Sequence, residues 1–256
     1  MSGRLAIDIG NTRIACAIFD NGELRDLQFH LLTDLQSAGH EISLFALDNN
    51  VREAAMSSVV PAAQDMLLSD LQRKNAMKIF VVDSESQPLL TNVYKGLGPD
   101  RIANASFGYK HYAHSAPAIV IDFGSATTLT AVSPQGKFLG GWITLGIGKT
   151  LAALNQGIAM LPDVQSKIES TKNFALGMNP EDAIIRGTLL AHAAAIDAWI
   201  DAARDELGLD AVVVATGGYS TKISPLCKRI SNADPLLTLK GVDLIAEAAM
   251  GRADLV

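Results

Sequence analysis

Apolar and polar positions along the chain follow two spacings, one typical of strands and one typical of helices. Short apolar runs predict strands near residues 5–9, 14–19, 52–60, 78–82, 119–123, 129–132 and 211–215. Apolar residues at helical spacing predict helices over residues 62–74, 184–207 and 242–250. Strands alternate with helices throughout, so the sequence predicts an α/β fold.

The chain contains a long-period internal repeat. Residues 5–22 align with residues 119–136 without a gap. In each copy an apolar strand ends in Asp-x-Gly, a second apolar strand returns, and a turn containing Gly follows. The identical pairs include Asp8 and Asp122, Gly10 and Gly124, Ala17 and Ala131, and Gly22 and Gly136. Two hairpins of one design predict two similar domains, residues 1–115 and residues 116–256.

Composition and charge restrict the class of protein. The 256 residues are 48% hydrophobic and 19% charged, which excludes a largely disordered chain. The formal net charge of −6 provides no overall positive field for nucleic acid or an anionic membrane. The 2 Cys are too few for a disulfide framework, and the N-terminus lacks the apolar segment of a signal peptide. We therefore expect a cytoplasmic protein with no nucleic-acid partner and no membrane association.

The repeated turns, Asp8–Thr12 and Asp122–Thr128, have the chemistry of a phosphate site. Glycine lets backbone N–H groups approach phosphate oxygens, hydroxyl groups donate further hydrogen bonds, and a carboxylate can hold a cation that neutralises the phosphates. A single turn of this kind is more often an ordinary hairpin turn, in which Asn and Gly satisfy the backbone angles. Two copies favour a nucleotide site.

Five segments, taken in order, resemble the signatures of type III pantothenate kinases. They are Asp8–Thr12, Gly98–Asn104, Asp122–Thr128, Gly140–Gly146 and Thr216–Gly218. That family belongs to the actin, sugar-kinase and acetate-kinase superfamily, so the resemblance implies two ribonuclease-H-like domains with an ATP cleft between them. It also implies ATP-dependent phosphorylation of pantothenate to 4'-phosphopantothenate, the first step of coenzyme A biosynthesis. The enzyme would be a homodimer that uses Mg²⁺ and either K⁺ or NH₄⁺.

The resemblance also implies roles for individual residues. The implied ATP contacts are Asp8, Ile9, Gly10, Asn11, Thr12, Arg13, Ile14, Ala15 and Ser125. The implied pantothenate contacts are Tyr94, Gly98, Pro99, Asp100, Arg101 and Pro180. Asp100 would be the general base, Asp122 would bind K⁺, and Asp8 would lie near Mg²⁺. The first role is chemically reasonable, because a carboxylate beside an alcohol can accept its proton as the γ-phosphoryl group arrives.

Two features on the acceptor side depart from the family pattern. Tyr94 is followed by a shorter loop than is usual before Gly98. Pro180 stands near a threonine of the family, so either Asn179 replaces the threonine hydroxyl or that contact is lost. The loss of the threonine near Pro180 motivates a second hypothesis, a non-catalytic regulatory protein of the same fold that binds nucleotide. Such a protein has no need of the Asp100 carboxylate.

Other motifs have simpler interpretations. Gly146–Thr150 ends like a P-loop, but Ile143 stands where that motif requires glycine. His192 lies in an apolar helical segment and is expected to be a packing residue with satisfied ring nitrogens. Trp142 and Trp199 are expected in the core or an interface rather than in a base-stacking site, because no basic residues interleave with them.

Overall fold

The computed structural model describes residues 3–114, 116–171, 174–208 and 210–253, and the chain divides into two compact units. Unit 1 comprises Met1–Ser115, Ser133–Phe138 and Leu236–Val256, and unit 2 comprises Ala116–Val132 and Leu139–Pro235. The first boundary, at residue 115, is the one expected from the repeat. The sequence analysis assigned all of residues 116–256 to the second domain, whereas the structure places two of these segments in unit 1.

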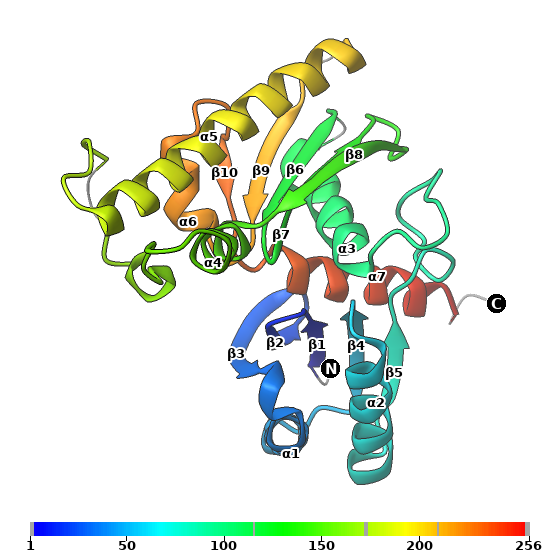
Figure 1. The fold of residues 1–256 in the computed structure, drawn as a ribbon. Helices are drawn as coiled ribbons and strands as arrows, with labels where there is room; N and C mark the ends of the chain where they lie inside the picture. The colour runs from blue at the N-terminus through cyan, green and yellow to red at the C-terminus, as the bar shows by residue number, and fades with distance from the viewer. Residues whose placement is uncertain (1–2, 115, 172–173, 209, 254–256) are drawn as a thin grey trace. The chain divides into compact units, whose positions relative to one another are not determined.

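Unit 1 is built on a five-stranded sheet with the order β3-β2-β1-β4-β5 (Figure 1). Its strands are β1 (Arg4–Ile9), β2 (Arg13–Asp20), β3 (Glu23–Leu31), β4 (Glu53–Ser58) and β5 (Lys78–Val81). Its helices are α1 (Leu35–Asp48), α2 (Pro61–Asn75), α3 (Pro99–Phe107) and α7 (Leu237–Ala253), with a 3-10 turn at Leu32–Asp34 and a π-helical turn at Gly108–Ala113. Neighbours among β1, β2 and β3 are antiparallel, whereas β4 runs parallel to both β1 and β5.

Helices cover both faces of the unit 1 sheet. Alternate residues of β1 point to opposite faces. Leu5 and Ile7 therefore pack in one cluster with α1 and α2, while Ala6 packs in another with α3 and α7. Helices α3 and α7 approach closely at Gly241, because a Cβ there would lie 2.1 Å from the Ala103 carbonyl oxygen. This contact fixes α3 on the face to which Ala6 points.

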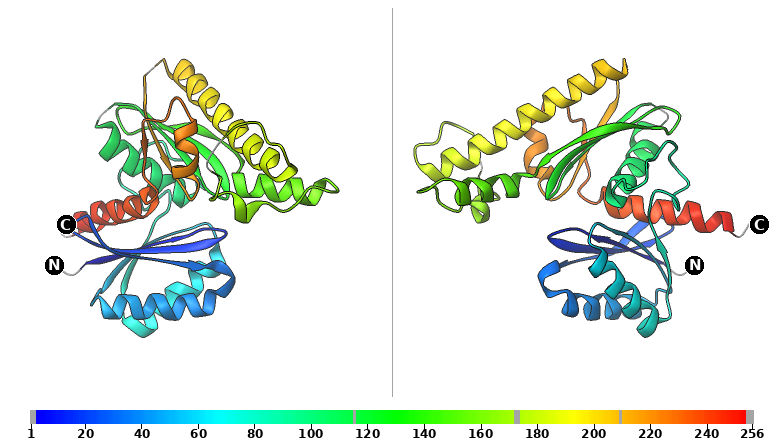
Figure 2. Two further views of the ribbon diagram at one scale, coloured as in Figure 1. Left: turned by 90° about the vertical axis from the view of Figure 1, so that its left-hand side faces the viewer. Right: turned by 45° about the vertical axis from the view of Figure 1, so that its right-hand side comes forward.

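Unit 2 is built on a second five-stranded sheet, with the order β10-β9-β6-β7-β8. Its strands are β6 (Ala118–Phe123), β7 (Ala126–Val132), β8 (Phe138–Leu145), β9 (Val212–Thr216) and β10 (Asn232–Ala233). Its helices are α4 (Ile147–Gly157), α5 (Pro180–Leu207) and α6 (Ser220–Ile223), with 3-10 turns at Gln165–Lys167 and Ser224–Leu226. Helix α5 runs along one face of the sheet (Figure 2), where Ile196 and Ile200 share a core with Ile121 and Phe123 of β6.

The two sheets have the same topology. When β6 to β10 are read as the counterparts of β1 to β5, one strand order becomes the other. In each sheet the first hairpin is antiparallel and the fourth strand runs parallel to the first. This is the ribonuclease-H-like arrangement, so the predicted α/β fold with an internal repeat is confirmed. Asp8 and Asp122 consequently occupy equivalent positions near the ends of β1 and β6.

Helix α5 is long and apolar enough, by length and composition, to cross a membrane. Its buried residues are spaced as in a helix that covers a core. They are Ile185, Thr188, Leu189, Ala193, Ile196, Ile200 and Ala203. The apolar composition of α5 is therefore explained by its packing against the sheet of unit 2.

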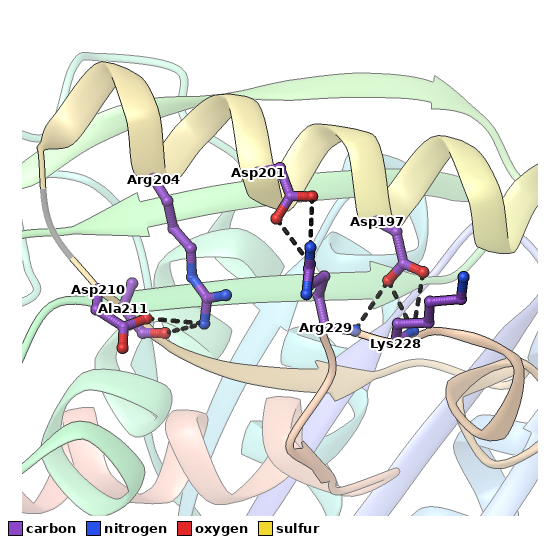
Figure 3. A network of polar contacts seen from close by, with 7 residues as sticks. All are labelled: Asp197, Asp201, Arg204, Asp210, Ala211, Lys228 and Arg229. Carbon is purple, nitrogen blue, oxygen red and sulfur yellow. Dashed lines mark hydrogen bonds and ion pairs between the residues drawn. The ribbon is translucent and has the colours of Figure 1, made fainter.

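A polar network ties α5 to the residue before β9 and to the segment before β10 (Figure 3). Asp197 accepts hydrogen bonds from the backbone N–H groups of Lys228, at 2.8 Å, and Arg229, at 2.9 Å. The Arg229 guanidinium donates to both carboxylate oxygens of Asp201, at 2.8 and 3.1 Å. Arg204 donates to the carbonyl oxygen of the residue before β9, at 2.8 Å. Helix α5 is thus anchored at successive turns near its C-terminal end.

The two tryptophans and the helical histidine of unit 2 lie where the sequence analysis expected them. Trp142 and Trp199 meet edge to face, with ring centroids 5.8 Å apart, and pack against the core. The ring nitrogens of His192 lie 3.2 Å from the Thr188 carbonyl oxygen and 3.1 Å from the Leu145 carbonyl oxygen. His192 thus links α5 to the end of β8, and because both neighbours are acceptors, a neutral ring can donate its one N–H to only one of them.

The sequence analysis did not predict α1 or the third strand of either sheet. Most positions of β3 are exposed, so the strand lacks the apolar run by which the others were recognised. Glycine and serine lower the intrinsic helix propensity of α1. In the folded chain this loss is offset by Ile42 and Phe45, which bury one face of the helix.

Candidate functional site

Asp8 stands near the end of β1, directly opposite Ser57 on the parallel strand β4. Ser57 Oγ donates a hydrogen bond to Asp8 Oδ1 at 2.5 Å. Because side chains alternate along a strand, Asp8 points to the same face as Ala6, the face that α3 covers. The first repeated turn therefore begins with a carboxylate that a neighbouring strand orients.

Asp100 is the second residue of α3, after Gly98 at the N-cap and Pro99 at the first position. This position favours a carboxylate, because the unpaired N–H groups of the first helical turn carry partial positive charge. The Arg101 backbone N–H donates to Asp100 Oδ1 at 2.8 Å. A Cβ at residue 98 would lie 2.5 Å from the same oxygen, so a larger residue there would displace the Asp100 carboxylate from this position.

The charges of Asp8 and Asp100 interact. Burial raises the pKa of Asp8 to about 6. The Ser57 hydrogen bond opposes this rise, whereas repulsion from Asp100 adds to it. The positive charge of Arg13 also opposes the rise. Burial also raises the pKa of Asp100, against the hydrogen bond and the charge of Arg101. Two neighbouring carboxylates that repel one another favour a bound cation, and a carboxylate with a raised pKa is a better proton acceptor.

The turn that follows Asp8, Gly10–Arg13, presents polar groups to solvent. The backbone N–H of its first residue donates to the carbonyl of its last at 3.0 Å, and its last three residues are exposed. The side chains of Ile9 and Ile14 are fully buried, so these two expected ATP contacts offer only backbone atoms to a ligand. Ala15 pairs with Asp8 across β1 and β2, and its side chain is a single methyl group.

Other residues expected on the acceptor side also lie in unit 1. Arg101 follows Asp100 in α3 and is buried. The ring of Tyr94 meets that of Phe138 edge to face, with centroids 5.6 Å apart. Tyr94 is 52% exposed, so it retains a large accessible surface. The structure thus brings the start of α3 to Asp8, and it anchors Tyr94 through Phe138.

The second repeated turn, Asp122–Ser125, belongs to unit 2. Gly146, the N-cap of α4, donates its backbone N–H to the Ser125 carbonyl at 3.1 Å. The backbone after β9 passes close to the carboxylate: a Cβ at Gly217, where φ is +91°, would lie 2.4 Å from Asp122 Oδ1. Glycine is therefore required at residue 217 both for its backbone angle and for space.

Thr216 lies opposite Asp122 in the pairing of β6 with β9. Paired residues on neighbouring strands point to the same face of a sheet, so the hydroxyl and the carboxylate share a face. Thr216 is fully buried, and among the described residues its Oγ1 has no hydrogen-bond partner. A buried oxygen without a partner, next to a carboxylate, is a suitable ligand for a cation.

The segment expected to contact pantothenate in unit 2 is used to cap a helix. Asn179 Oδ1 accepts a hydrogen bond from the Asp182 backbone N–H at 2.9 Å, and its amide donates to the Asp182 carboxylate at 3.2 Å. Pro180 is the first residue of α5 and is exposed. The side-chain oxygen of Asn179 is therefore already engaged, and Pro180 supplies no hydroxyl.

The described residues contain no group of three or more His, Cys, Asp and Glu side chains that could hold a metal ion. The donors present are single carboxylates beside hydroxyls, Asp8 with Ser57 and Asp122 with Thr216. This sparse set of oxygen donors fits Mg²⁺, which keeps several of its waters and binds through one or two carboxylates together with substrate phosphates. Oxygen donors likewise suit a monovalent cation.

The sequence analysis missed Ser57 and noted Thr216 only as part of a motif. Both residues stand on the fourth strand of their sheet, opposite the repeated aspartate. The signal that could have found them is the repeat itself, once the strand order is known. Each repeated aspartate has a hydroxyl residue at the equivalent position of the neighbouring parallel strand.

Comparisons with known proteins identify the family. A family model described as type III pantothenate kinase matches residues 4–202. A type III pantothenate kinase of Moorella thermoacetica is 32% identical over 255 residues, which cover 95% of this chain and 98% of that protein. Another, from Rubrobacter xylanophilus, is 34% identical over 269 residues, which cover 97% and 99%. The crystal structure of ROK hexokinase from Thermus thermophilus matches with a TM-score of 0.52 at 14% identity, covers 95% of this chain and 98% of its own, and so shares the fold. This chain belongs to the type III pantothenate kinase family.

Proposed function

We propose that this chain transfers the γ-phosphoryl group of ATP to pantothenate, with Asp100 as the general base. Membership of the family gives the reaction, the phosphorylation of pantothenate to 4'-phosphopantothenate in coenzyme A biosynthesis. The observation that supports the role of Asp100 is its electrostatic interaction with Asp8 at the first repeated turn. A carboxylate that is close to the phosphate turn but carried on a different element can meet the acceptor hydroxyl.

The environment of Asp100 suits a base in phosphoryl transfer. One of its oxygens is oriented by the Arg101 N–H, which holds the carboxylate in place for the acceptor hydroxyl. Most of the acceleration of phosphoryl transfer comes from positioning and from neutralisation of charge. Asp100 would orient the hydroxyl of pantothenate and accept its proton as the new oxygen–phosphorus bond forms and ADP leaves.

The turn Gly10–Arg13 is the proposed site of the ATP phosphates, with Mg²⁺ near Asp8. The exposed part of the turn presents the side chains of Asn11, Thr12 and Arg13 as donors. Mg²⁺, when bound, would neutralise charge on the phosphates, and Asp8 would hold it or its waters. Ser125 remains an expected contact of ATP.

Asp122 together with Thr216 is the proposed site for K⁺ or NH₄⁺. Support comes from the buried Thr216 hydroxyl, which has no hydrogen-bond partner in the described part of the chain and shares a sheet face with the carboxylate. A cation at this point would give the Thr216 hydroxyl oxygen a partner beside the carboxylate.

On the acceptor side, Tyr94, Gly98, Pro99 and Arg101 are the proposed contacts of pantothenate. The guanidinium of Arg101 suits the carboxylate of the acceptor. Because the Asn179 oxygen caps α5, this chain would bind pantothenate without a hydroxyl contact near Pro180.

Exposed apolar side chains on unit 2 support a homodimer. Ile143 and Leu145 of β8 are 61% and 56% exposed, and Leu190 of α5 is 44% exposed. Association of two copies would remove such side chains from water. We expect a cytoplasmic homodimer without nucleic-acid or membrane partners. Light scattering on the purified protein tests the mass, and Ile143→Lys is expected to yield monomers.

The variant Asp100→Asn tests the proposed base. It keeps the size of the side chain but removes the proton acceptor, so we expect kcat to fall by about 100-fold to 10,000-fold. The variant should stay folded and should still bind Mg·ATP. Asp65→Asn, at an exposed position of α2, is the matched control and should turn over normally. A normal kcat in Asp100→Asn would eliminate Asp100 as the base. If the wild-type protein binds ATP but does not phosphorylate pantothenate, the regulatory alternative is favoured.

A further inference from the structure

A row of four residues crosses the unit 1 sheet at the level of Asp8. Ser57 of β4 pairs with Asp8, Asp8 pairs with Ala15 of β2, and Ala15 pairs with Phe29 of β3. Residues paired across neighbouring strands point to the same face, so Phe29 shares the face of the Asp8 carboxylate. Since strands lie about 4.8 Å apart, Phe29 is roughly 10 Å from Asp8 across the row.

Arg13 shares this face as well, because it precedes Ala15 by two residues on β2. The carbon at the centre of its guanidinium lies 5.0 Å from the centroid of the Phe29 ring, over the face of the ring. This distance is within the range of a cation–π contact. The same guanidinium is close enough to Asp8 for its charge to oppose the rise in the pKa of that carboxylate.

The N–H donors of the Arg13 guanidinium are available to a ligand. Among the described residues it makes no hydrogen bond and no ion pair; its neighbours are the Phe29 ring and the charge of Asp8. Phe29 is 50% exposed and Arg13 is exposed. An aromatic ring thus holds a guanidinium in place while its five N–H donors remain available to an anion.

We propose that Phe29 is a positioning residue that holds the Arg13 guanidinium beside the first repeated turn, where it provides a fixed positive charge for the phosphates of ATP. This inference rests on the proposed binding of ATP at that turn. Arginine loses much side-chain entropy when it is immobilised. A guanidinium that Phe29 already holds loses less side-chain entropy when ATP binds. The affinity for ATP therefore rises without a new contact.

Direct binding of Mg·ATP, measured by isothermal titration calorimetry on the full chain, tests this role. Phe29→Leu keeps an apolar side chain but removes the ring, so we expect Kd for Mg·ATP to rise about twofold to fivefold. Arg13→Gln should raise it about tenfold and should weaken the dependence of Kd on salt concentration. Phe29→Trp keeps an aromatic face and should bind ATP as the wild type does.

A double-mutant cycle separates positioning from general structure. In the Arg13→Gln background, Phe29→Leu should cause no further loss, because the ring then has no guanidinium to hold. Additive losses would overturn the inference, as would unchanged affinity in Phe29→Leu. Leu24→Ala, at a residue of the same strand that is 41% exposed, is the matched control and should leave Kd unchanged.

Turnover of pantothenate, measured in parallel, distinguishes failure of this inference from failure of the proposed function. If the wild type turns over and Phe29→Leu binds ATP normally, the positioning role alone is wrong. If the wild type binds Mg·ATP without turnover and the cycle behaves as described, the positioning role stands and the proposed reaction fails. If the wild type does not bind Mg·ATP, both are wrong.

Discussion

Ser57 and Asp8 face each other across β4 and β1, and the Ser57 hydroxyl donates a hydrogen bond of 2.5 Å to the carboxylate. The bond favours the ionised form of Asp8. It therefore opposes burial, which raises the pKa of this group to about 6. The serine helps to keep Asp8 charged at neutral pH, the state that a cation requires.

We expect Ser57→Ala to make the enzyme more sensitive to acid. Loss of the hydrogen bond raises the pKa of Asp8 further, so the carboxylate is neutralised at a higher pH than in the wild type. The acid limb of the profile of kcat/KM for ATP should move to higher pH, by up to about one pH unit. Rates well above neutral pH should be close to those of the wild type.

Ser58→Ala is the control for this profile. The Ser58 hydroxyl bonds to the Val60 backbone rather than to Asp8. Its loss should leave the acid limb in place. A profile of Ser57→Ala that superimposes on the wild type would show that the hydrogen bond does not govern the ionisation of Asp8.

The contact of α7 with α3 leads to a second prediction. A Cβ at Gly241 would lie 2.1 Å from the Ala103 carbonyl oxygen, and backbone cannot yield as a flexible side chain does. We expect Gly241→Ala to lower the free energy of unfolding by roughly 1–3 kcal/mol. We also expect it to lower kcat, because α3 carries Asp100. Urea denaturation and pantothenate turnover measure the two effects.

Gly251→Ala, in the same helix, provides the matched control. A Cβ at residue 251 meets nothing within 4 Å. Replacing a helical glycine by alanine without a clash should raise stability by roughly 0.5–1 kcal/mol. Equal effects of the two substitutions would show that the close approach at Gly241 does not position α3.

The sequence predicted the parts of the fold that depend on local signals. The repeated strands were recognisable from short apolar runs, and the turns at Asp8 and Asp122 from their glycine and hydroxyl residues. The strand order and the pairing of Asp8 with Ser57 could not be read in this way, because the two residues are 49 positions apart. The same reason explains the placement of α7, since nothing local to Leu237–Ala253 indicates that it packs with α3.

The same distinction between local signals and long-range packing applies to the candidate site. Gly98 and Pro99 before Asp100 form a local pattern that is typical of a helix start. The coupling of Asp100 to Asp8, and the cation–π contact of Arg13 with Phe29, depend on which elements pack together. The family resemblance indicated the residues of the first pair, whereas Phe29 required the register of β2 with β3.

Asp197 is expected to contribute substantially to the stability of unit 2. Its carboxylate accepts hydrogen bonds from two consecutive backbone N–H groups, at 2.8 and 2.9 Å (Figure 3). We expect Asp197→Ala to lower the free energy of unfolding by about 1–3 kcal/mol, since it removes a charged acceptor. Asp197→Asn keeps one oxygen acceptor and should cost less. Asp205→Ala, at an exposed position of the same helix, is the control and should change the free energy of unfolding by less than about 0.5 kcal/mol. If Asp205→Ala lowers the free energy of unfolding as much as Asp197→Ala does, the role of Asp197 is contradicted.

Thr216 offers a test of the monovalent cation site that does not alter a carboxylate. Thr216→Val replaces the hydroxyl by a methyl group of similar size. If the hydroxyl binds K⁺ beside Asp122, the concentration of K⁺ that gives half-maximal activity should rise several-fold, while kcat at saturating K⁺ changes little. The unfolding temperature without K⁺ should not fall, because among the described residues the buried hydroxyl has no hydrogen bond to lose.

Thr127→Val is the matched control for this variant. Thr127 is also fully buried, and its hydroxyl likewise lacks a hydrogen-bond partner in the described part of unit 2. It pairs with Phe123 rather than with Asp122, so it points to the opposite face of the sheet. Thr127→Val should therefore leave the requirement for K⁺ unchanged. If the two valine variants respond to K⁺ alike, the cation does not bind at Thr216, and the site proposed at Asp122 loses its hydroxyl ligand.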